Sequence, residues 1–171
     1  APFVHKMDFY SIVSTHEGHD GKQVTSQVLN IRRFDMPTED VIEHLQLEPG
    51  TPVVYIKRLF LFDDKPLAVG RSWLSLARFP GLDETGLGEK GLTATLRSRY
   101  NTIIRRFNDA IEAVRPAPDE RNLLDVSYDC PLLMVRGLSF DQHNVPVEYS
   151  TTYWLGDKVR FTVSMNTQEV E

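Results

Sequence analysis

The chain has 171 residues, of which 41% are hydrophobic and 25% are charged, a composition that fits one globular domain. No apolar run approaches the roughly 20 residues needed to cross a bilayer, and no secretory signal pattern opens the chain. The formal net charge is −5, and basic and acidic residues are mixed throughout, unlike the basic face of a nucleic-acid binder. We therefore expect a cytoplasmic protein that binds DNA poorly by itself.

Motifs of common enzymes and metal sites are missing from the sequence. It contains no P-loop, no G-x-G-x-x-G, no H-E-x-x-H and no G-x-S-x-G. The single cysteine, Cys130, excludes an intramolecular disulfide and a cysteine-cluster metal site. His16 and His19 lack a third ligand nearby and are interpreted as a surface pair. We therefore expect no catalytic residue, no metal and no cofactor.

The predicted elements follow an irregular, polar lead-in over residues 1–22, and residues 23–168 are expected to form a single domain. The pattern predicts, in chain order, a strand over 24–34, a helix between Thr38 and Gly50, strands over 51–62 and 66–74, a helix over 93–100, a strand over 103–114, a short helix with Pro118 in its first turn, and strands over 131–140, 146–155 and about 160–165. Short turns between paired strands favour antiparallel hairpins. The fold class is therefore α+β, a mostly antiparallel sheet with packed helices.

A helix-plus-hairpin unit occurs twice in the sequence. Aligning Pro52 with Pro131 also sets Leu59 against Leu138, and the two second strands then begin at equivalent prolines. If this repeat is structural, we expect two equivalent hairpins that face each other across a pseudo-symmetric cavity.

Arg58 lies in the middle of an otherwise apolar face of the strand over 51–62, as strand alternation shows. A buried arginine is costly unless it is paired, so two interpretations are open. Arg58 is a structural ion-pair or snorkelling residue, or it anchors an anionic or hydroxylated ligand. Glu148 could pair with Arg58 or with Arg106. Neighbouring strand faces carry small and hydroxylated residues such as Ser72, which predicts a polar-lined pocket or, alternatively, a solvated sheet face.

Five segments spread over almost the full length resemble a known family. They are GTPVVYIKRL at 50–59, LTATLRSRY at 92–100, IIRRFNDAIEAV at 103–114, PVEYS at 146–150 and GDKVRF at 156–161. Together they are similar to the UTRA domain, the effector-binding module of HutC-type regulators in the GntR superfamily. The last two segments match the closing signature of that family and are the most specific.

The resemblance implies a chorismate lyase-like fold with a six-stranded antiparallel sheet. It also implies a homodimer, a winged-helix DNA-binding half that precedes Ala1 in the intact protein, and a small-molecule effector that controls operator affinity. The effector-binding residues that we expect from the resemblance and from the strand faces are Arg58, Phe60, Ser72, Thr93, Arg106, Glu148 and Trp154.

Two positions depart from the family pattern. Phe60 stands where phosphosugar-binding members have a second arginine, and Gly70 stands where many members have an acidic residue. These departures predict a less charged or partly aromatic effector. Two other functions stay open: an enzyme of the chorismate lyase type that acts on a small carboxylate, and a dimerisation scaffold whose cavity is filled by side chains.

Overall fold

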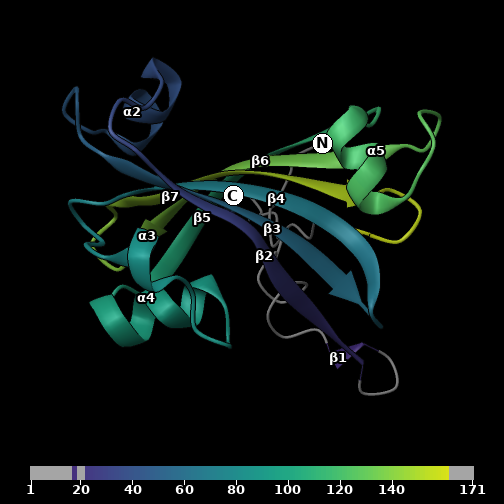
Figure 1. The fold of residues 1–171 in the computed structure, drawn as a ribbon, viewed down its shortest axis with the longest axis horizontal. Coiled ribbons are helices and arrows are strands. Elements are labelled where there is room, and N and C mark those ends of the chain that lie inside the picture. The colour runs from purple at the N-terminus through teal and green to yellow at the C-terminus, as the bar shows by residue number, and fades with distance from the viewer. Residues whose placement is uncertain (1–16, 19–21, 162–171) are drawn as a thin grey trace, which may run out of the picture.

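The computed structural model of the chain describes residues 17–18 and 22–161, which form one antiparallel sheet covered by helices (Figure 1). In chain order the elements are β1 (Glu17–Gly18), β2 (Lys22–Phe34), α2 (Glu39–Leu45), β3 (Val53–Phe62), β4 (Lys65–Ser75), α3 (Leu82–Thr85), α4 (Leu92–Tyr100), β5 (Ile104–Val114), α5 (Pro118–Leu124), β6 (Leu132–Asp141) and β7 (Pro146–Leu155). Helices α2 and α5 lie on one face of the sheet, and α3 and α4 lie on the other (Figure 1). Among the described helices, none has the length and apolar character that a membrane crossing requires.

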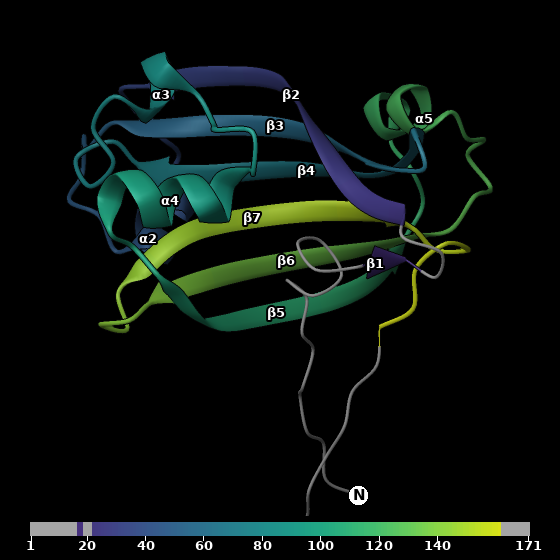
Figure 2. The same ribbon diagram turned by 90° about the horizontal axis from the view of Figure 1, so that it is seen from below.

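The six long strands are ordered β2-β3-β4-β7-β6-β5 across the sheet (Figure 2), and the short β1 pairs with β2. Each strand pairs antiparallel with its neighbours. Six of them are long, and β1 has only two residues. The predicted α+β class with about six antiparallel strands is therefore confirmed.

The internal repeat is visible in the structure and is longer than the sequence indicated. A strand, a helix and a hairpin occur twice, as β2-α2-β3-β4 and as β5-α5-β6-β7. The two units meet where β4 pairs with β7, and there Arg71 lies opposite Thr151, its counterpart in the other repeat. The hairpins thus lie side by side in one sheet and do not face each other across a cavity as expected. Pairing at the centre satisfies backbone groups that two facing hairpins would leave as open edges.

Alternation along β3 divides its side chains between the two faces of the sheet. Val54 and Ile56 are fully buried in the core that includes residues of α3 and α4. Val53 packs in the cluster that includes α2, and Leu59 packs with residues of α5. Arg58 follows Ile56 on the same face, so the register of this core directs it toward α4.

Three elements differ from the sequence-based expectation. Helix α2 begins after Thr38 as predicted but ends before Gly50, because Gln46 adopts a left-handed backbone with φ of 53°. The sequence pattern does not predict the single-turn helix α3, because it lies in a Pro/Gly-rich segment between β4 and α4. The polar lead-in, including the histidine pair, and the strand over 160–165 fall mainly outside the described residues.

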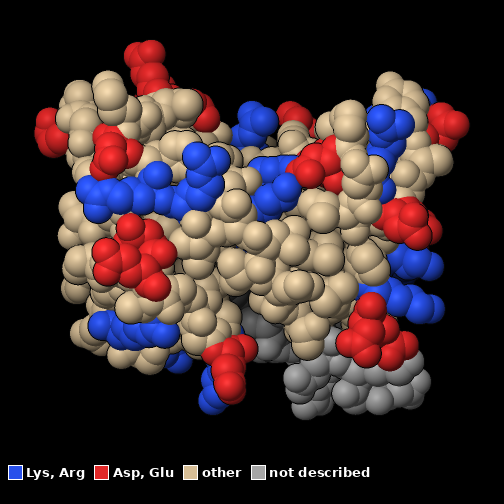
Figure 3. Space-filling model, viewed as in Figure 1, with Lys and Arg blue, Asp and Glu red and all other residues tan. Residues whose placement is uncertain are grey.

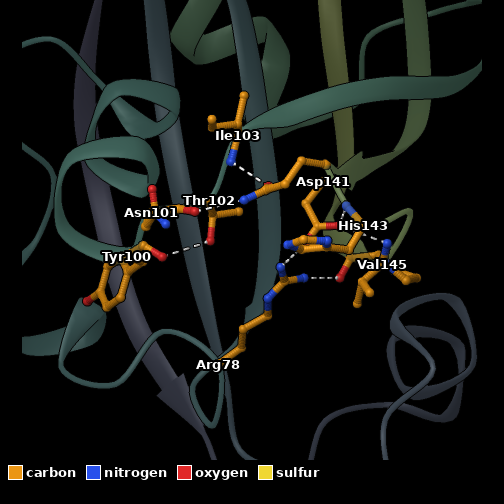
Figure 4. A network of polar contacts seen from close by, with 10 residues as sticks. Arg78, Tyr100, Asn101, Thr102, Ile103, Asp141, His143 and Val145 are labelled. Atoms are coloured by element: carbon orange, nitrogen blue, oxygen red, sulfur yellow. Dashed lines mark hydrogen bonds and ion pairs between the residues drawn. The ribbon is translucent and has the colours of Figure 1, made fainter.

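The β6–β7 turn is tied to neighbouring loops by the buried carboxylate of Asp141 (Figure 4). This carboxylate accepts hydrogen bonds from the backbone N–H groups of His143 at 2.8 Å and Val145 at 2.9 Å, and it pairs with Arg78. In the same turn, the side chain of Gln142 accepts a hydrogen bond from the backbone N–H of Ile103 and donates one to the carbonyl oxygen of Asn101. Both residues belong to the segment that follows α4. The C-terminal end of α4 is therefore fixed to the sheet.

Candidate functional site

A cavity of about 730 Å³ lies between the N-terminal end of α4 and the sheet. Both halves of the repeat contribute to its walls, together with the loop before α4. Five of the seven predicted site residues line it, namely Arg58, Phe60, Thr93, Glu148 and Trp154. The pocket predicted from the strand faces is therefore present in the structure.

Arg58 is the buried cation of this cavity, with a side chain that is 12% exposed. Its Nη2 lies 3.6 Å from Oε2 of Glu148 and 3.4 Å from Oγ of Ser72. Its guanidinium lies 5.0 Å from the ring centroid of Phe60. The remaining Nε is buried and has no hydrogen-bond partner. A buried donor without a partner is costly, so this N–H group is suited to donate a hydrogen bond to an acceptor atom of a ligand in the cavity.

Glu148 is paired with Arg58, which settles the choice of partner that the sequence left open. Ser72 donates a 2.5 Å hydrogen bond to Oε2 of Glu148. Ser72 is itself 1% exposed and does not line the cavity. Its position therefore orients the carboxylate and the guanidinium without touching the cavity, which differs from the direct contact we expected.

Arg106 lies away from the cavity, in contrast to the sequence-based expectation. Its Nε and Nη2 donate hydrogen bonds to Oδ1 of Asn144 at 3.1 and 2.8 Å, and its guanidinium lies over the ring of Phe140. A register shift in β5 immediately precedes Arg106. Phe107 and Asp109, which alternate with it, line the cavity instead.

Phe60 and Gly70, the two departures from the family pattern, form a single packing unit. A Cβ atom at Gly70 would lie 2.8 Å from Cε2 of Phe60, so the ring fills the space that a side chain on β4 would need. The ring also stacks on Trp154, with centroids 6.0 Å apart and planes at 14°. The cavity therefore has an aromatic wall at the place where the family pattern has charged residues.

Gly137 has a comparable relation to Asp109 on the opposite side of the cavity. A Cβ atom at Gly137 would overlap with Oδ1 of Asp109, so the carboxylate occupies the space above the glycine. Two residues further along β6, the hydroxyl of Ser139 is buried and has no hydrogen-bond partner. This wall thus carries a carboxylate and an unsatisfied hydroxyl side by side.

The N-terminal end of α4 forms the roof of the cavity. The helix begins directly after Gly91, whose φ of 89° favours glycine, and no side chain caps its first turn. Lys90 and Arg97 line the cavity together with Thr93. Sequence reasoning identified Thr93 and missed the two cations. Arg97 lies four residues after Thr93, which places the two on one side of α4, whereas Lys90 precedes the helix.

Charges in the cavity lining balance each other. Three cationic side chains, Arg58, Lys90 and Arg97, are matched by three acidic ones, Glu89, Asp109 and Glu148. No cluster of His, Cys, Asp or Glu within the described part of the chain could hold a metal ion. The lining therefore suits an organic ligand with both donor and acceptor groups and a small net charge.

Comparison with known proteins identifies the family of this chain. The UTRA domain family matches residues 19–160. The transcriptional repressor PhnF of Mycolicibacterium smegmatis is 29% identical over 135 residues, which are 78% of this chain and 55% of the repressor. The regulator GmuR of Bacillus subtilis is 26% identical over 140 residues, 80% of this chain and 57% of that protein. The chain thus spans little more than half the length of these relatives.

Solved structures show the same fold. The crystal structure of PhnF from Mycobacterium smegmatis superposes with a TM-score of 0.82 at 25% identity, covering 91% of this chain and 68% of that one. The structure of the PhnF effector domain also gives a TM-score of 0.82, covering 96% of this chain and 98% of that one at 24% identity, which supports the fold alone. Because the family match covers most of the sequence, the chain belongs to the UTRA domain family, and the curated relatives named above are transcription regulators.

Proposed function

We propose that residues 23–168 are the effector-binding and dimerisation domain of a transcription regulator, and that a small molecule in the cavity beside Arg58 controls operator affinity. The single observation that carries the proposal is the buried, unpartnered Nε of Arg58 in the wall of a cavity of about 730 Å³. The names of the relatives support the regulatory role.

DNA contacts are assigned to a winged-helix segment outside this chain, in a cytoplasmic regulator. The net charge of −5 supports that assignment. On the face shown in Figure 3, Lys and Arg side chains are interspersed with Asp and Glu and form no broad basic surface. A DNA-binding face needs clustered cations that neutralise several phosphates.

The proposed effector carries an acceptor group, a carboxylate or a hydroxyl, which accepts a hydrogen bond from Nε of Arg58. Ser139 offers a second unsatisfied polar group to the same molecule. The remainder of the ligand is less charged and partly apolar, because Phe60 and Trp154 form one wall and the lining charges cancel. A phosphosugar fits this aromatic wall less well than a partly apolar carboxylate does, because the wall offers no cation to pair with a phosphate.

The effector would act by changing the position of the N-terminal end of α4. A ligand between Arg58 and Thr93 bridges the sheet and this end of the helix, whereas the segment after α4 is already held by Gln142. Such a ligand shifts the conformational equilibrium only to the extent that it binds the two states with different affinity. The coupling to operator binding is reciprocal.

An enzyme of the chorismate lyase type is the competing function, and the proposal treats the chain as a binding domain without catalytic residues. The regulatory relatives support this choice. Incubating the chain with chorismate and assaying 4-hydroxybenzoate and pyruvate tests the choice directly. Turnover that is lost in Arg58→Met would replace the regulatory proposal with the enzymatic one.

Thermal denaturation with a panel of small carboxylates, amino acids and sugar phosphates tests effector binding. A ligand at 100 times its Kd stabilises the folded state by about 2.7 kcal/mol, which corresponds to roughly 5–11 °C in a domain of this size. Arg58→Met should abolish the shift, whereas Arg115→Met, which changes a 57% exposed arginine, should retain it. No shift with any compound, or an equal shift in both variants, would contradict the proposal.

A further inference from the structure

We infer that the effector carries a primary ammonium group close to its carboxylate, and that this ammonium binds between Asp109, Ser139 and Glu148 on the sheet side of the cavity. The inference rests on the proposed function, because it names the chemistry of the molecule that the same cavity takes. It is carried by three acceptor groups that border one area of the cavity wall, one of which is buried without a partner.

The sheet side of the cavity is rich in hydrogen-bond acceptors. The lining residues from β5, β6 and β7 include two carboxylates and three hydroxyls, those of Asp109, Glu148, Ser139, Ser150 and Thr152. None of the described lining residues on these three strands is a cation, since Lys90 and Arg97 lie at the roof and Arg58 lies on β3. This part of the wall therefore suits a group that donates hydrogen bonds and carries a positive charge.

Strand pairing brings three of these acceptors together. Glu148 on β7 lies directly opposite Ser139 on β6, and Gly137, two residues before Ser139, lies opposite Asp109 on β5. The Cβ atoms of opposite residues are about 4.5–5.5 Å apart, and residues two apart along a strand are separated by roughly 6.8 Å. A Cβ atom at Gly137 would overlap with Oδ1 of Asp109 and lie 3.1 Å from its Cγ, so this carboxylate lies over β6. The three acceptors therefore border one small area of the sheet.

Ser139 is the residue that points to a bound molecule. It is only 3% exposed and lines the cavity, and among the described residues its hydroxyl has no hydrogen-bond partner. The hydroxyl of Ser72, by contrast, donates to Glu148. A buried hydroxyl without a partner costs free energy, because it has lost its hydrogen bonds to water without replacement. A ligand that donates a hydrogen bond to Ser139 would recover that cost.

Glu148 keeps one carboxylate oxygen for a ligand. Within the described part of the chain, its two polar contacts both fall on Oε2, from Ser72 at 2.5 Å and from Nη2 of Arg58 at 3.6 Å. Oε1 therefore remains to accept a hydrogen bond. Because Arg58 lies so near this carboxylate, the ammonium site adjoins the arginine that binds the acceptor group of the effector. The ammonium and the carboxylate of the ligand are thus close together, as they are in an α-amino acid.

A primary ammonium fits these acceptors better than other groups do. It has three N–H donors and no acceptor, and its charge complements a carboxylate. A hydroxyl donates only one hydrogen bond, and an anionic group would be repelled by Asp109 and Glu148. A metal ion is not favoured, because no cluster of three His, Cys, Asp or Glu within the described residues could hold one. With Phe60 and Trp154 beside the apolar remainder, the ligand class is an α-amino acid with an apolar or aromatic side chain.

Matched pairs of compounds test the ammonium. Each apolar amino acid is compared with the acid that lacks its amino group, such as leucine with 4-methylpentanoate and phenylalanine with 3-phenylpropanoate. Thermal denaturation should show a higher Tm with at least one amino acid and a clearly smaller shift with its deaminated partner. Glucosamine and glucose, tested in the same way, distinguish an amino sugar from an amino acid. A shift with glucosamine and with none of the amino acids would overturn the assigned ligand class.

Substitution of Asp109 tests the contact, with isothermal titration calorimetry of the pair that gives the largest difference. Asp109→Asn should raise the Kd of the amino acid at least about tenfold and leave that of its deaminated partner within about twofold, because only the amine loses a charge-assisted hydrogen bond. A general folding defect would weaken both compounds equally. Glu112→Gln, at an exposed position on β5 outside the cavity lining, is the matched control and should change neither Kd. Gly137→Ala should resemble Asp109→Asn, because its Cβ displaces the carboxylate.

Ser139→Ala separates binding from stability. The substitution removes a buried hydroxyl that has no partner, so the urea midpoint of the chain without added compound should be unchanged or higher. The Kd of the amino acid should rise by about fivefold, because one hydrogen bond to the ammonium is lost. A lower midpoint together with an unchanged Kd would show that Ser139 has a structural role and would overturn its assignment to the ammonium site.

Failure of the ammonium site is distinguishable from failure of effector binding. A thermal shift that an amino acid and its deaminated partner produce equally, and that is lost in Arg58→Met but kept in Asp109→Asn, would overturn the ammonium site and leave binding beside Arg58 intact. A shift that depends on the amino group and on both Arg58 and Asp109 would confirm the two contacts together. No shift with any compound of either kind would contradict the effector-binding proposal itself.

Discussion

Glu148→Gln should destabilise the fold, because it removes the negative charge beside a buried arginine. Glutamine keeps the volume of the side chain and an acceptor for Ser72, so the change isolates the charge. Arg58 and Glu148 are only 12% and 8% exposed. Breaking a buried pair costs about 3–5 kcal/mol. The separation of 3.6 Å is long for a direct hydrogen bond, so we expect a loss near the lower limit, about 3 kcal/mol.

Urea denaturation measures this loss as a lower midpoint with an unchanged m value. Glu43→Gln, at an exposed position on α2, is the matched control and should change stability by no more than about 0.5 kcal/mol. Adding Arg58→Met to Glu148→Gln should recover stability, because the uncompensated cation is then gone. A loss below about 1 kcal/mol in Glu148→Gln, or no recovery in the double variant, would refute the description of this pair as buried and coupled.

Burial raises the pKa of Asp141, but backbone hydrogen bonds and a neighbouring arginine outweigh it and hold that pKa below the ordinary 3.8. The ionised carboxylate therefore stabilises the native state above about pH 4, and this stabilisation is lost as the pH falls through the pKa of the folded protein. In a plot of the urea midpoint against pH, Asp141→Asn should therefore show a smaller decrease at acidic pH than the unsubstituted chain. Gly70→Ala should cost about 1–3 kcal/mol in urea denaturation, because it places a Cβ 2.8 Å from the ring of Phe60, and Phe60→Leu should recover part of the loss. Arg71→Ala should lower the free energy of unfolding by about 3 kcal/mol, because it removes the cation 2.7 Å from the buried carboxylate of Glu120. Thermal denaturation measures this loss, with Lys65→Ala at an exposed position as the control.

Most of the fold was predictable because local patterns and tertiary structure agree. Two-residue alternation placed the long strands, and it put Arg58, Ser72 and Glu148 on one face of the sheet, where the structure brings them together. The repeat was recognisable because its hairpins share prolines and apolar positions. Its spatial arrangement was not, since sequence similarity between two hairpins does not specify which of their edges pair.

The candidate site was predictable only in part, for identifiable reasons. Arg106 was misplaced because a single register shift reverses the face of every residue that follows it. Asp109 was missed because its role depends on the absence of a side chain at Gly137, on a different strand. Helical spacing placed Arg97 on the same side of α4 as Thr93, but whether that side and the preceding Lys90 reach the cavity depends on where α4 lies over the sheet.

The most direct test of the central claim is a crystal structure of this chain with a compound that raises its Tm. The account predicts density for the compound beneath the N-terminal end of α4, with an acceptor atom within hydrogen-bond distance of Nε of Arg58 and a polar atom near Oγ of Ser139. A compound bound elsewhere, for example on the face between α2 and α5, with the Arg58–Glu148 pair and the cavity unchanged, would contradict it.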